Sequence, residues 1–297
     1  MIRKAVVTAA GLGTRLLPVT KEIPKEMLPV LVPIKNNLIA LKPTLQIIFE
    51  DLYACGIREF YVIVGRGKRA IEDHFTPDYG FLDCLIERGK EDIARELKAF
   101  YNKVERSIIV WINQPEPKGF GDAVLRARAM IKDEPFIVHA GDTLVFSRNR
   151  EHHVKRLMNL FNTRKATASL LLKEVSNPEL YGVVISKEIK KDVVKVVKII
   201  EKPKTPPSNL AVIPIYVFDS LIFSALEKSK LSEKGELELT SAIQKVVEWD
   251  FEVVGLVLDE NYEWLDIGTP ESYWRAIKCS RDFSILKEKV ISPEITG

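Results

Sequence analysis

The chain has 297 residues, of which 46% are hydrophobic and 29% are charged. It carries 44 Lys and Arg against 41 Asp and Glu, so its formal net charge is only +3. A chain of this length and apolar content can bury a sizeable core, which excludes intrinsic disorder, and the near-balanced charge argues against a dedicated nucleic-acid binder. No run approaches the roughly 18 apolar residues of a membrane span, so we expect no membrane partner.

The three cysteines, Cys55, Cys84 and Cys279, are widely separated and form no CxxC pair. An odd and sparse set of this kind, without a histidine at metal-ligand spacing, is typical of reduced thiols in a cytoplasmic protein. The apolar run at residues 5–10 is too short for a signal peptide and ends in glycines and an arginine. We therefore expect a cytoplasmic protein.

The first half of the chain alternates strand and helix patterns. Residues 3–8 form a short β-branched run that stops at Gly11, and residues 44–54 place apolar side chains at helical spacing ahead of Gly56. Residues 60–64 form a second buried strand pattern. Strand, loop, helix and strand in this order predict a parallel βαβ unit.

The alternation continues with a strand pattern at residues 108–112, an amphipathic helix at 122–131 and a strand at 135–142 that ends in a polar turn. The charged stretch between Tyr79 and Tyr101 predicts a helix on the surface, and a binding patch is the alternative interpretation. This order of elements indicates an α/β fold with a doubly wound sheet.

In the second half of the chain, several strand patterns follow one another without helical patterns between them. Strand patterns at residues 167–172, 181–186, 195–202 and 209–218 precede a helical pattern at 220–228, so mixed or antiparallel strands are expected. The proline-rich run at 202–208 predicts an irregular loop, and the tail from Tyr273 begins as a helix and ends in polar residues. The sequence has no internal repeat.

The segment AGLGTRLLPVTKEIPKEMLP, residues 10–29, is the most informative one. Gly11 and Gly13 follow a buried strand, where successive backbone N–H groups can turn toward a phosphate chain; a tight structural turn is the alternative. The spacing of a Walker loop is absent, and Leu16 stands where a dinucleotide-binding GxGxxG motif needs its third glycine. The missing glycine argues against a nicotinamide dehydrogenase.

Three basic residues, Arg15, Lys21 and Lys25, lie within eleven residues beside these glycines. Pro24 and Pro29 stiffen the loop, so that a lysine can be held toward the same space. A solvated basic face is the alternative interpretation.

The same segment resembles the signature of the nucleoside-triphosphate:sugar-1-phosphate nucleotidyltransferases, specifically that of bacterial-type UTP:glucose-1-phosphate uridylyltransferases, also called UDP-glucose pyrophosphorylases. Further matches follow in the order of that family, from residue 5 to about 275: KPTLQ at 42–46, IEDHF at 71–75, Gln114 with KGFGDAV at 118–124, AGD at 140–142, YGVV at 181–184, EKP at 201–203, PSNLAV at 207–212, GELELTSAI at 235–243 and DIG at 266–268.

The resemblance implies a fold of the nucleotide-diphospho-sugar transferase type. This is a Rossmann-like, doubly wound, mostly parallel mixed sheet with a small antiparallel sugar-binding part. We expect a single nucleotidyltransferase domain over residues 1–297, with a nucleotide-binding half at 1–142, a sugar-phosphate-binding half at 143–275 and a C-terminal tail at 276–297.

The resemblance also assigns nucleotide-binding residues. The glycine-rich loop would contact the triphosphate and the base through Ala10, Gly11, Leu12, Gly13, Thr14 and Arg15. Gln114 would read the uracil edge, because an amide offers both a donor and an acceptor, as the imide face does. Gly119 would let the backbone approach the nucleoside, and a plain turn glycine is the alternative.

Two aspartates are implied as the ligands of a magnesium ion. Asp142 ends a strand pattern at the edge where such sheets bind ligands. Asp266, within WLDIGTP, matches the second carboxylate; an aspartate that caps a turn before Gly268 is the alternative.

The sugar side is implied by the second half of the chain. By resemblance, Glu201 and Gly182 bind the glucosyl group and Lys202 binds its 1-phosphate, while a polar strand end is the alternative for EKP. Asn209 and Val212 would line the sugar pocket.

The implied reaction is in-line attack of a glucose 1-phosphate oxygen on the α-phosphorus of UTP, with release of pyrophosphate. Arg15, Lys25 and Lys202, together with Mg²⁺, would offset the repulsion between the two anions. The resemblance further implies a homo-oligomer, either a dimer or a tetramer. A thymidylyltransferase that uses dTTP and a catalytically silent regulatory homologue remain alternatives.

The sequence departs from the family pattern in two places. IKNNLIAL, residues 34–41, intervenes before Lys42, and we expect it to extend a loop near the mouth of the active site. IVHAGD, residues 137–142, lacks the proline that uridylyltransferases tend to carry before the aspartate, and its Gly-Asp form is similar to that of thymidylyltransferases.

Overall fold

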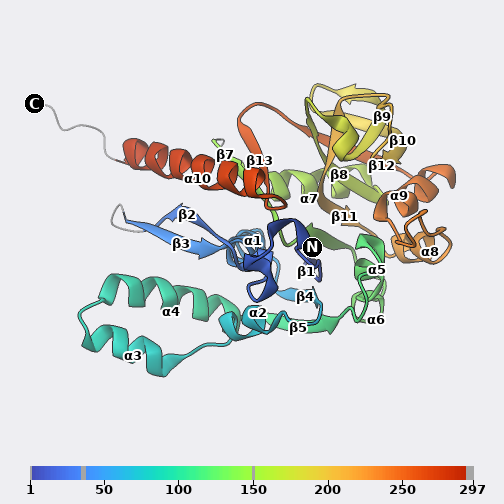
Figure 1. Cartoon of the computed structure of the whole chain (residues 1–297). Coiled ribbons are helices and arrows are strands. Elements are labelled where there is room, and N and C mark those ends of the chain that lie inside the picture. Colours follow the sequence, from blue (N-terminus) through green and yellow to red (C-terminus); the bar gives the residue numbers. More distant parts are fainter. Residues whose placement is uncertain (1, 35–37, 149–150, 292–297) are drawn as a thin grey trace, which may run out of the picture.

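The computed structural model describes residues 2–34, 38–148 and 151–291, with side chains up to Phe283. A nine-stranded sheet runs through the molecule (Figure 1). In spatial order its strands are β5 (Ile108–Asn113), β4 (Glu59–Val64), β1 (Lys4–Ala9), β6 (Phe136–Ala140), β11 (Leu210–Phe218), β8 (Ala168–Glu174), β12 (Val253–Leu258), β10 (Val193–Glu201) and β9 (Gly182–Lys190).

The direction of pairing changes across this sheet. β5, β4, β1 and β6 are all parallel to one another, whereas β11 pairs antiparallel with both β6 and β8. β8 pairs with β12 in parallel. The last two pairs of the sheet are antiparallel: β12 with β10, and β10 with β9, which form a hairpin. The sheet is therefore mixed, and the expectation of a mostly parallel sheet holds only for its first four strands.

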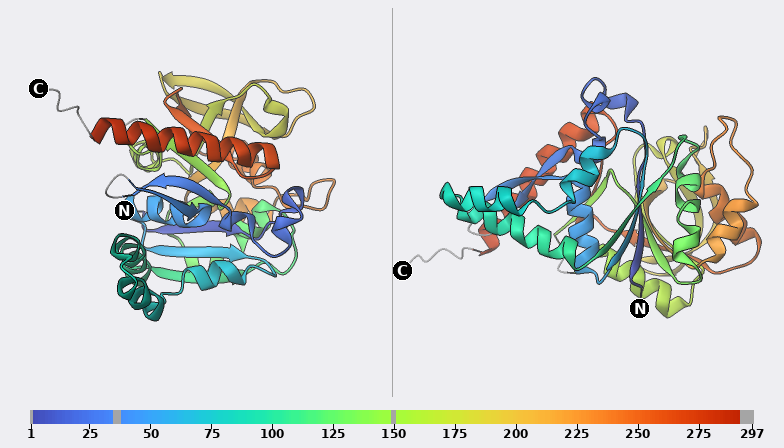
Figure 2. Two further views of the ribbon diagram at one scale, coloured as in Figure 1. Left: turned by 60° about the vertical axis from the view of Figure 1, so that its left-hand side comes forward. Right: turned by 90° about the horizontal axis from the view of Figure 1, so that it is seen from below.

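Helices cover both faces of the sheet (Figure 2, right). One core packs α1, α4, α7 and α10 against the sheet, and the other packs α5, α6, α8 and α9. The helices are α1 (Thr44–Ala54), α2 (Arg69–His74), α3 (Tyr79–Glu87), α4 (Glu91–Glu105), α5 (Phe120–Leu125), α6 (Arg128–Ile131), α7 (His153–Arg164), α8 (Leu221–Glu227), α9 (Leu239–Glu248) and α10 (Pro270–Ile291).

The two-sided burial explains the apolar strand patterns of the first half. In β1, Ala5 and Val7 belong to one core and Val6 belongs to the other. A strand covered on both faces requires an unbroken apolar run rather than alternation. The predicted strands and the helix at 44–54 are confirmed, as are the antiparallel strands of the second half.

Within the insertion at residues 34–41, residues 39–41 form a strand rather than the loop that we expected. β2 (Pro29–Pro33) and β3 (Ile39–Pro43) pair antiparallel as a hairpin, because the β-branched run of β2 supplies an edge for β3. The hairpin packs against α10 and extends away from the sheet (Figure 1). Residues 35–37 lie outside the described residues.

Two predicted helices are divided. The stretch at 122–131 forms α5 and α6, because the N–H of Ala127 bonds to Val124 rather than one residue further back, yet Ala123, Ala127 and Ile131 still face the core. The charged stretch at 79–101 lies in α3 and α4, which are separated at Gly89, whose φ is +68°. Glycine adopts this left-handed conformation without the cost that other residues incur.

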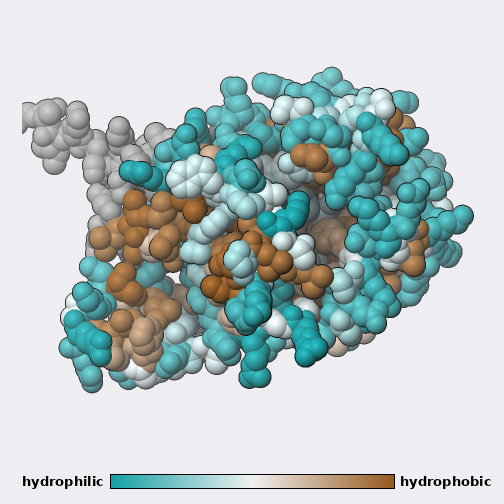
Figure 3. Space-filling model, in the orientation of Figure 1, coloured by the Kyte–Doolittle hydropathy of each residue, from teal (hydrophilic) through white to brown (hydrophobic). Residues whose placement is uncertain are grey.

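Exposed apolar side chains gather over the hairpin and the neighbouring helices α3 and α4, at the left of Figure 3. They include Ile39, Leu41, Phe81, Ile86 and Ile93. None of the helices in the described ranges has both the length and the apolarity to cross a bilayer. The helix predicted from Tyr273 is confirmed as part of α10, and the polar end of the tail, residues 292–297, lies outside the described residues.

Candidate active site

The carboxyl ends of β1 and β6 open onto a pocket of about 420 Å³. Adjacent parallel strands bring their carboxyl ends to the same edge of a sheet, which is where such folds bind ligands. The pocket is lined by Thr8, Ala10, Gly11, Leu12, Gly13, Thr14, Arg15, Lys25, Glu26, Gln114, Pro117, Gly119, Phe120, Ala123, Ala140, Asp142, Glu236 and Gly268.

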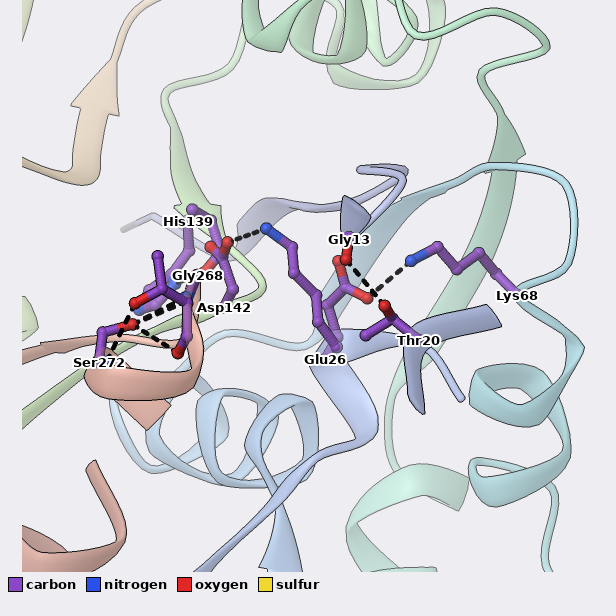
Figure 4. Close-up of polar contacts among 11 residues, drawn as sticks. Gly13, Thr20, Glu26, Lys68, His139, Asp142, Gly268 and Ser272 are labelled. Carbon is purple, nitrogen blue, oxygen red and sulfur yellow. Dashed lines mark hydrogen bonds and ion pairs between the residues drawn. The ribbon is translucent and has the colours of Figure 1, made fainter. Parts of the chain in front are cut away.

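The glycine-rich turn after β1 folds over Lys25. Thr20 donates a hydrogen bond of 2.8 Å from Oγ1 to the carbonyl of Gly13, whose φ is +67° (Figure 4). A Cβ atom at position 11 would lie 3.5 Å from Cε of Lys25. The turn and the lysine therefore line the same space, as the sequence predicted.

Lys25 and Asp142 form an ion pair inside the pocket (Figure 4). Their side chains are only 15% and 17% exposed. Burial lowers the pKa of Lys25, but the charges of Asp142 and Glu26 outweigh it and leave this pKa above its ordinary value. Lys25 is therefore a permanent positive charge at the edge of the sheet.

Asp266 lies beside Asp142. It ends β13 (Tyr262–Asp266), which pairs antiparallel with β7 (Thr143–Ser147) so that Asp266 faces Thr143. The N–H of Ile267 donates to the carbonyl of Asp142 at 2.9 Å. Burial, followed by the charge of Asp142, raises the pKa of Asp266 to about 6, which shows that the two carboxylates repel each other.

The turn after β13 brings Arg15 to the same place. A Cβ atom at Gly268 would lie 2.5 Å from Oδ2 of Asp266 and 3.0 Å from Nη2 of Arg15, so both side chains close over this glycine. The hydroxyl of Ser272 accepts the N–H groups of Gly268 and Thr269 at 3.2 and 2.9 Å (Figure 4). The turn is thereby held in place.

Gln114 lies at the other end of the pocket. Its side chain is buried, and Nε2 donates to the carbonyl of Gly119 at 3.1 Å and to Oδ2 of Asp122 at 2.7 Å. These two bonds use the amide N–H groups and leave Oε1 as an acceptor. Gly119 has φ +102°, and a Cβ atom there would lie 2.6 Å from the carbonyl oxygen of Leu237, so only glycine fits.

The site thus combines a glycine-rich turn, two basic residues, the neighbouring carboxylates of Asp142 and Asp266, and a buried amide. A model of the family described as nucleotidyl transferase matches residues 4–282. The chain belongs to the nucleotidyl transferase family. Its structure is accordingly a mixed α/β nucleotidyltransferase fold.

Relatives within this family cover nearly the whole chain. A UTP–glucose-1-phosphate uridylyltransferase 1 of Staphylococcus saprophyticus is 36% identical over 99% of this chain and 96% of its own length. The UTP–glucose-1-phosphate uridylyltransferase of Bacillus subtilis is 39% identical over 84% of each chain. A crystal structure of a UDP-glucose pyrophosphorylase in complex with UDP-glucose is 29% identical, with a TM-score of 0.80 over 95% of this chain and 99% of that one.

The residues that were expected to bind the sugar phosphate form a second group. A Cβ atom at Gly182 would lie 3.2 Å from Oε2 of Glu201 and 4.0 Å from Cγ2 of Val212. Nζ of Lys202 lies 3.5 Å from Oε1 of Glu201, and its charge lowers the pKa of Asp266, so this group borders the carboxylate pair. Asn209 is exposed on the loop before β11. None of these sugar-side residues is among those that line the pocket, and neither is Asp266.

Several pocket residues were not singled out from the sequence. Glu26 is almost fully buried and pairs with Lys68 at 2.9 Å (Figure 4), although burial raises its pKa above the ordinary value. Glu236 and Gly268 also line the pocket. These three pocket residues lie inside the matching motifs, so only their side-chain contacts required the structure.

Proposed function

We propose that this chain forms UDP-glucose and pyrophosphate from UTP and glucose 1-phosphate. One observation carries the proposal: Lys25, Arg15 and Asp142 line one pocket beneath the glycine-rich turn, and Asp266 lies at its border, against the lining residue Gly268. The names of the two relatives, both UTP–glucose-1-phosphate uridylyltransferases, agree with this chemistry. Uridylyl transfer needs such a pocket because both substrates are highly charged anions.

The mechanism follows from the charges of the pocket. An oxygen of glucose 1-phosphate attacks the α-phosphorus of UTP, a P–O bond forms, and the bond to pyrophosphate breaks. Arg15 and Lys25 bind the triphosphate, Lys202 binds the sugar phosphate, and the turn at residues 10–14 wraps the nucleotide. Alignment of the two substrates supplies about 7–11 kcal/mol of the barrier reduction, and no protein nucleophile is required.

The base and the sugar are bound by the remaining residues. Oε1 of Gln114 accepts the N–H of the uracil imide, because its amide nitrogen is already engaged by Asp122. Gly119 allows the nucleoside to approach the backbone. Gly182 and Glu201 hold the glucosyl group, with Val212 and Asn209 at the border of its site.

Asp142 and Asp266 would hold Mg²⁺. Hard carboxylate oxygens suit this ion, which commonly binds to one or two carboxylates and completes its shell with water and substrate phosphates. The raised pKa of Asp266 supports the fit, since a cation relieves the repulsion between the two carboxylates. In the described residues no group of three or more His, Cys, Asp or Glu forms a metal site, so phosphate oxygens would complete the shell. When bound, the ion neutralises negative charge on the phosphates.

The finer description of the fold belongs to the same proposal. We infer a Rossmann-like, doubly wound nucleotide-binding half at 1–142, a sugar-phosphate-binding half at 143–275 and a tail at 276–297, within a single domain. The spatial order β5, β4, β1, β6 supports this description, because the chain order reverses between β1 and β6, above which the pocket lies.

We also propose that the protein acts in the cytoplasm as a homo-oligomer, either a dimer or a tetramer. The three free cysteines support a reducing compartment. The exposed apolar side chains over the hairpin, α3 and α4 support contact with a second copy of the chain.

A panel assay tests the function. UTP, dTTP, ATP, CTP and GTP are each offered with glucose 1-phosphate, galactose 1-phosphate and an amino-sugar 1-phosphate, and pyrophosphate release is measured. We expect the highest kcat/KM for UTP with glucose 1-phosphate. A preference for dTTP would make the chain a thymidylyltransferase, and the absence of turnover with every pair would indicate a regulatory sugar-nucleotide-binding homologue.

A further inference from the structure

A second group of reactive side chains lies at the opposite edge of the sheet from the pocket. Cys55 directly follows α1, and His152 directly precedes α7. Sγ of Cys55 is 3.4 Å from Nδ1 of His152, and Nε2 of the same ring is 3.7 Å from Oδ2 of Asp51. Because α1 connects the parallel strands β1 and β4, its carboxyl end lies at the amino-terminal edge of the sheet, remote from the pocket.

The hydrogen bonding of His152 orients its ring. The N–H of Val154 donates to Nδ1 at 3.3 Å, which makes Nδ1 an acceptor and leaves the ring proton on Nε2, toward Asp51. The thiol of Cys55 therefore faces a basic nitrogen, and a carboxylate faces the opposite side of the ring. The thiol, the imidazole and the carboxylate thus stand in line as nucleophile, base and orienting group. This is the arrangement that activates cysteine nucleophiles.

The charges around the ring stabilise the imidazolium that forms once Nδ1 has accepted the thiol proton. Burial lowers the pKa of His152, but Asp51 and Cys55 outweigh it and raise this pKa. His153, from α7, stacks on the ring with centroids 4.4 Å apart, and His139 approaches from β6. Burial lowers the pKa of both neighbours, so they are neutral at pH 7 and do not repel a charged His152.

The two arginines near this group, Arg156 and Arg58, are engaged by other partners. Arg156 of α7 pairs with Asp192 at 2.5 Å. Arg58 donates from Nη1 to the carbonyls of Tyr53 and Ile57 at 2.7 and 2.6 Å, which offsets the negative end of the α1 dipole beside the thiol.

The group is accessible and is not a metal site. The side chains of His152 and Asp51 are 28% and 45% exposed, and Cys55 is half-buried. The two ring nitrogens point in opposite directions, toward the thiol and toward the carboxylate, so the three residues cannot ligate one ion together. Within the described ranges, no cluster suitable for a metal includes them.

We propose that Asp51, His152 and Cys55 form a nucleophilic thiol site that is modified by small disulfides. The sulfur of Cys55 attacks one sulfur of the disulfide, an S–S bond forms to Cys55, the original S–S bond breaks, and the second half leaves as a thiolate. The thiol proton passes to Nδ1 of His152 and from there to solvent. Cys55 becomes a mixed disulfide, and an added thiol reverses the reaction.

The chain contains its own controls. Cys84 and Cys279 are also free and half-buried, and in the described part of the chain neither thiol has a charged or imidazole partner. The full-length protein is treated at pH 7 with 4,4′-dithiodipyridine, and the modification of each cysteine is followed by mass spectrometry of its peptide. We expect Cys55 to react about tenfold faster than the other two, and to react at the same rate as they do in urea.

Matched variants test whether Cys55 reacts faster because His152 and Asp51 activate its thiol or only because the thiol is exposed. His152→Asn and Asp51→Asn are expected to remove most of the rate advantage of Cys55, and Asp51→Asn to shift its pH–rate profile. Asp73→Asn, an equal charge change on the exposed face of α2, is expected to leave the rate unchanged. Circular dichroism verifies that each variant is folded. Equal native rates for the three cysteines, or an unchanged rate in folded His152→Asn, would overturn the proposal.

Discussion

Lys25 makes several contacts that bear on the proposed chemistry. Its ammonium group lies on Asp142, next to the glycine-rich turn and against Glu26, and these neighbours hold it in the charged state. The ammonium therefore offsets part of the negative charge of the carboxylates, so that two anionic phosphate esters can bind beside them. Lys21, only four residues away, is 77% exposed and pairs weakly with Glu22 at 3.6 Å.

Lys25→Ala is predicted to fold normally and to lose most UDP-glucose synthesis. Removal of one preorganised electrostatic donor typically lowers the rate by about a hundred- to thousandfold. Pyrophosphate release under single-turnover conditions measures the loss, and Lys21→Ala serves as the control with the same change in charge. Undiminished turnover in Lys25→Ala would remove this lysine from the mechanism.

The identities of the site residues were easier to predict from the sequence than the contacts between them. The glycine-rich turn, Arg15, Lys25, Gln114 and Asp142 were all expected at one site, and the structure brings them to one pocket. The hydrogen bond from Gln114 to Asp122 was not expected, because residues eight positions apart on a loop and a helix meet only through the local course of the chain. The individual roles of these residues remain predictions.

At the scale of elements, an ion-pair network joins β3, α1 and α4. Nζ of Lys42 is 2.8 Å from Oε2 of Glu50 and 2.6 Å from Oε1 of Glu96, and Nζ of Lys103 is 2.7 Å from Oε1 of Glu50. Burial raises the pKa of Glu50, but the two lysines outweigh it and leave this pKa below its ordinary value. The charge of Glu50 therefore stabilises the folded state.

Glu50→Gln is predicted to lower the free energy of unfolding by about 2 kcal/mol at pH 7, because Lys42 and Lys103 lose a charged partner in a mostly buried site. Since the folded pKa of Glu50 lies below the unfolded value, its contribution is complete above that unfolded value and is lost as the pH falls through the folded value. Urea unfolding at pH 7 and at about pH 3 should show a smaller difference between variant and wild type at the lower pH.

The exposed Glu87, at the end of α3, provides a control for this measurement. Glu87→Gln is expected to leave the free energy of unfolding nearly unchanged at both pH values. An effect of Glu50→Gln no larger than that of Glu87→Gln would show that the network does not stabilise the fold.

At the scale of the whole molecule, the pocket draws on distant parts of the chain. Its walls come from the turn after β1, the end of β6, the segment before α9 and the turn after β13. A ligand that binds across these segments must stabilise the folded state as a unit, because the unfolded chain offers no such site.

UTP and Mg²⁺, each at a free concentration about a hundred times its dissociation constant, are each predicted to stabilise the protein by about 2.7 kcal/mol. For a chain of this size each contribution corresponds to a rise in Tm of about 5 °C. Differential scanning fluorimetry with UTP, Mg²⁺ and both together measures the effect. In Asp142→Asn the increment that Mg²⁺ adds to UTP should disappear, and an unchanged increment would contradict the assignment of Asp142 as a ligand.

The sequence by itself determined the alternation of strands and helices and the order of the motifs. Both depend on neighbouring residues, through periodic burial and turn chemistry. It did not determine that β2 and β3 pair and pack against α10, nor that the stretch at 79–101 is divided at Gly89. Only the tertiary structure decided that Cys55 meets His152, because this contact depends on packing between segments roughly a hundred residues apart.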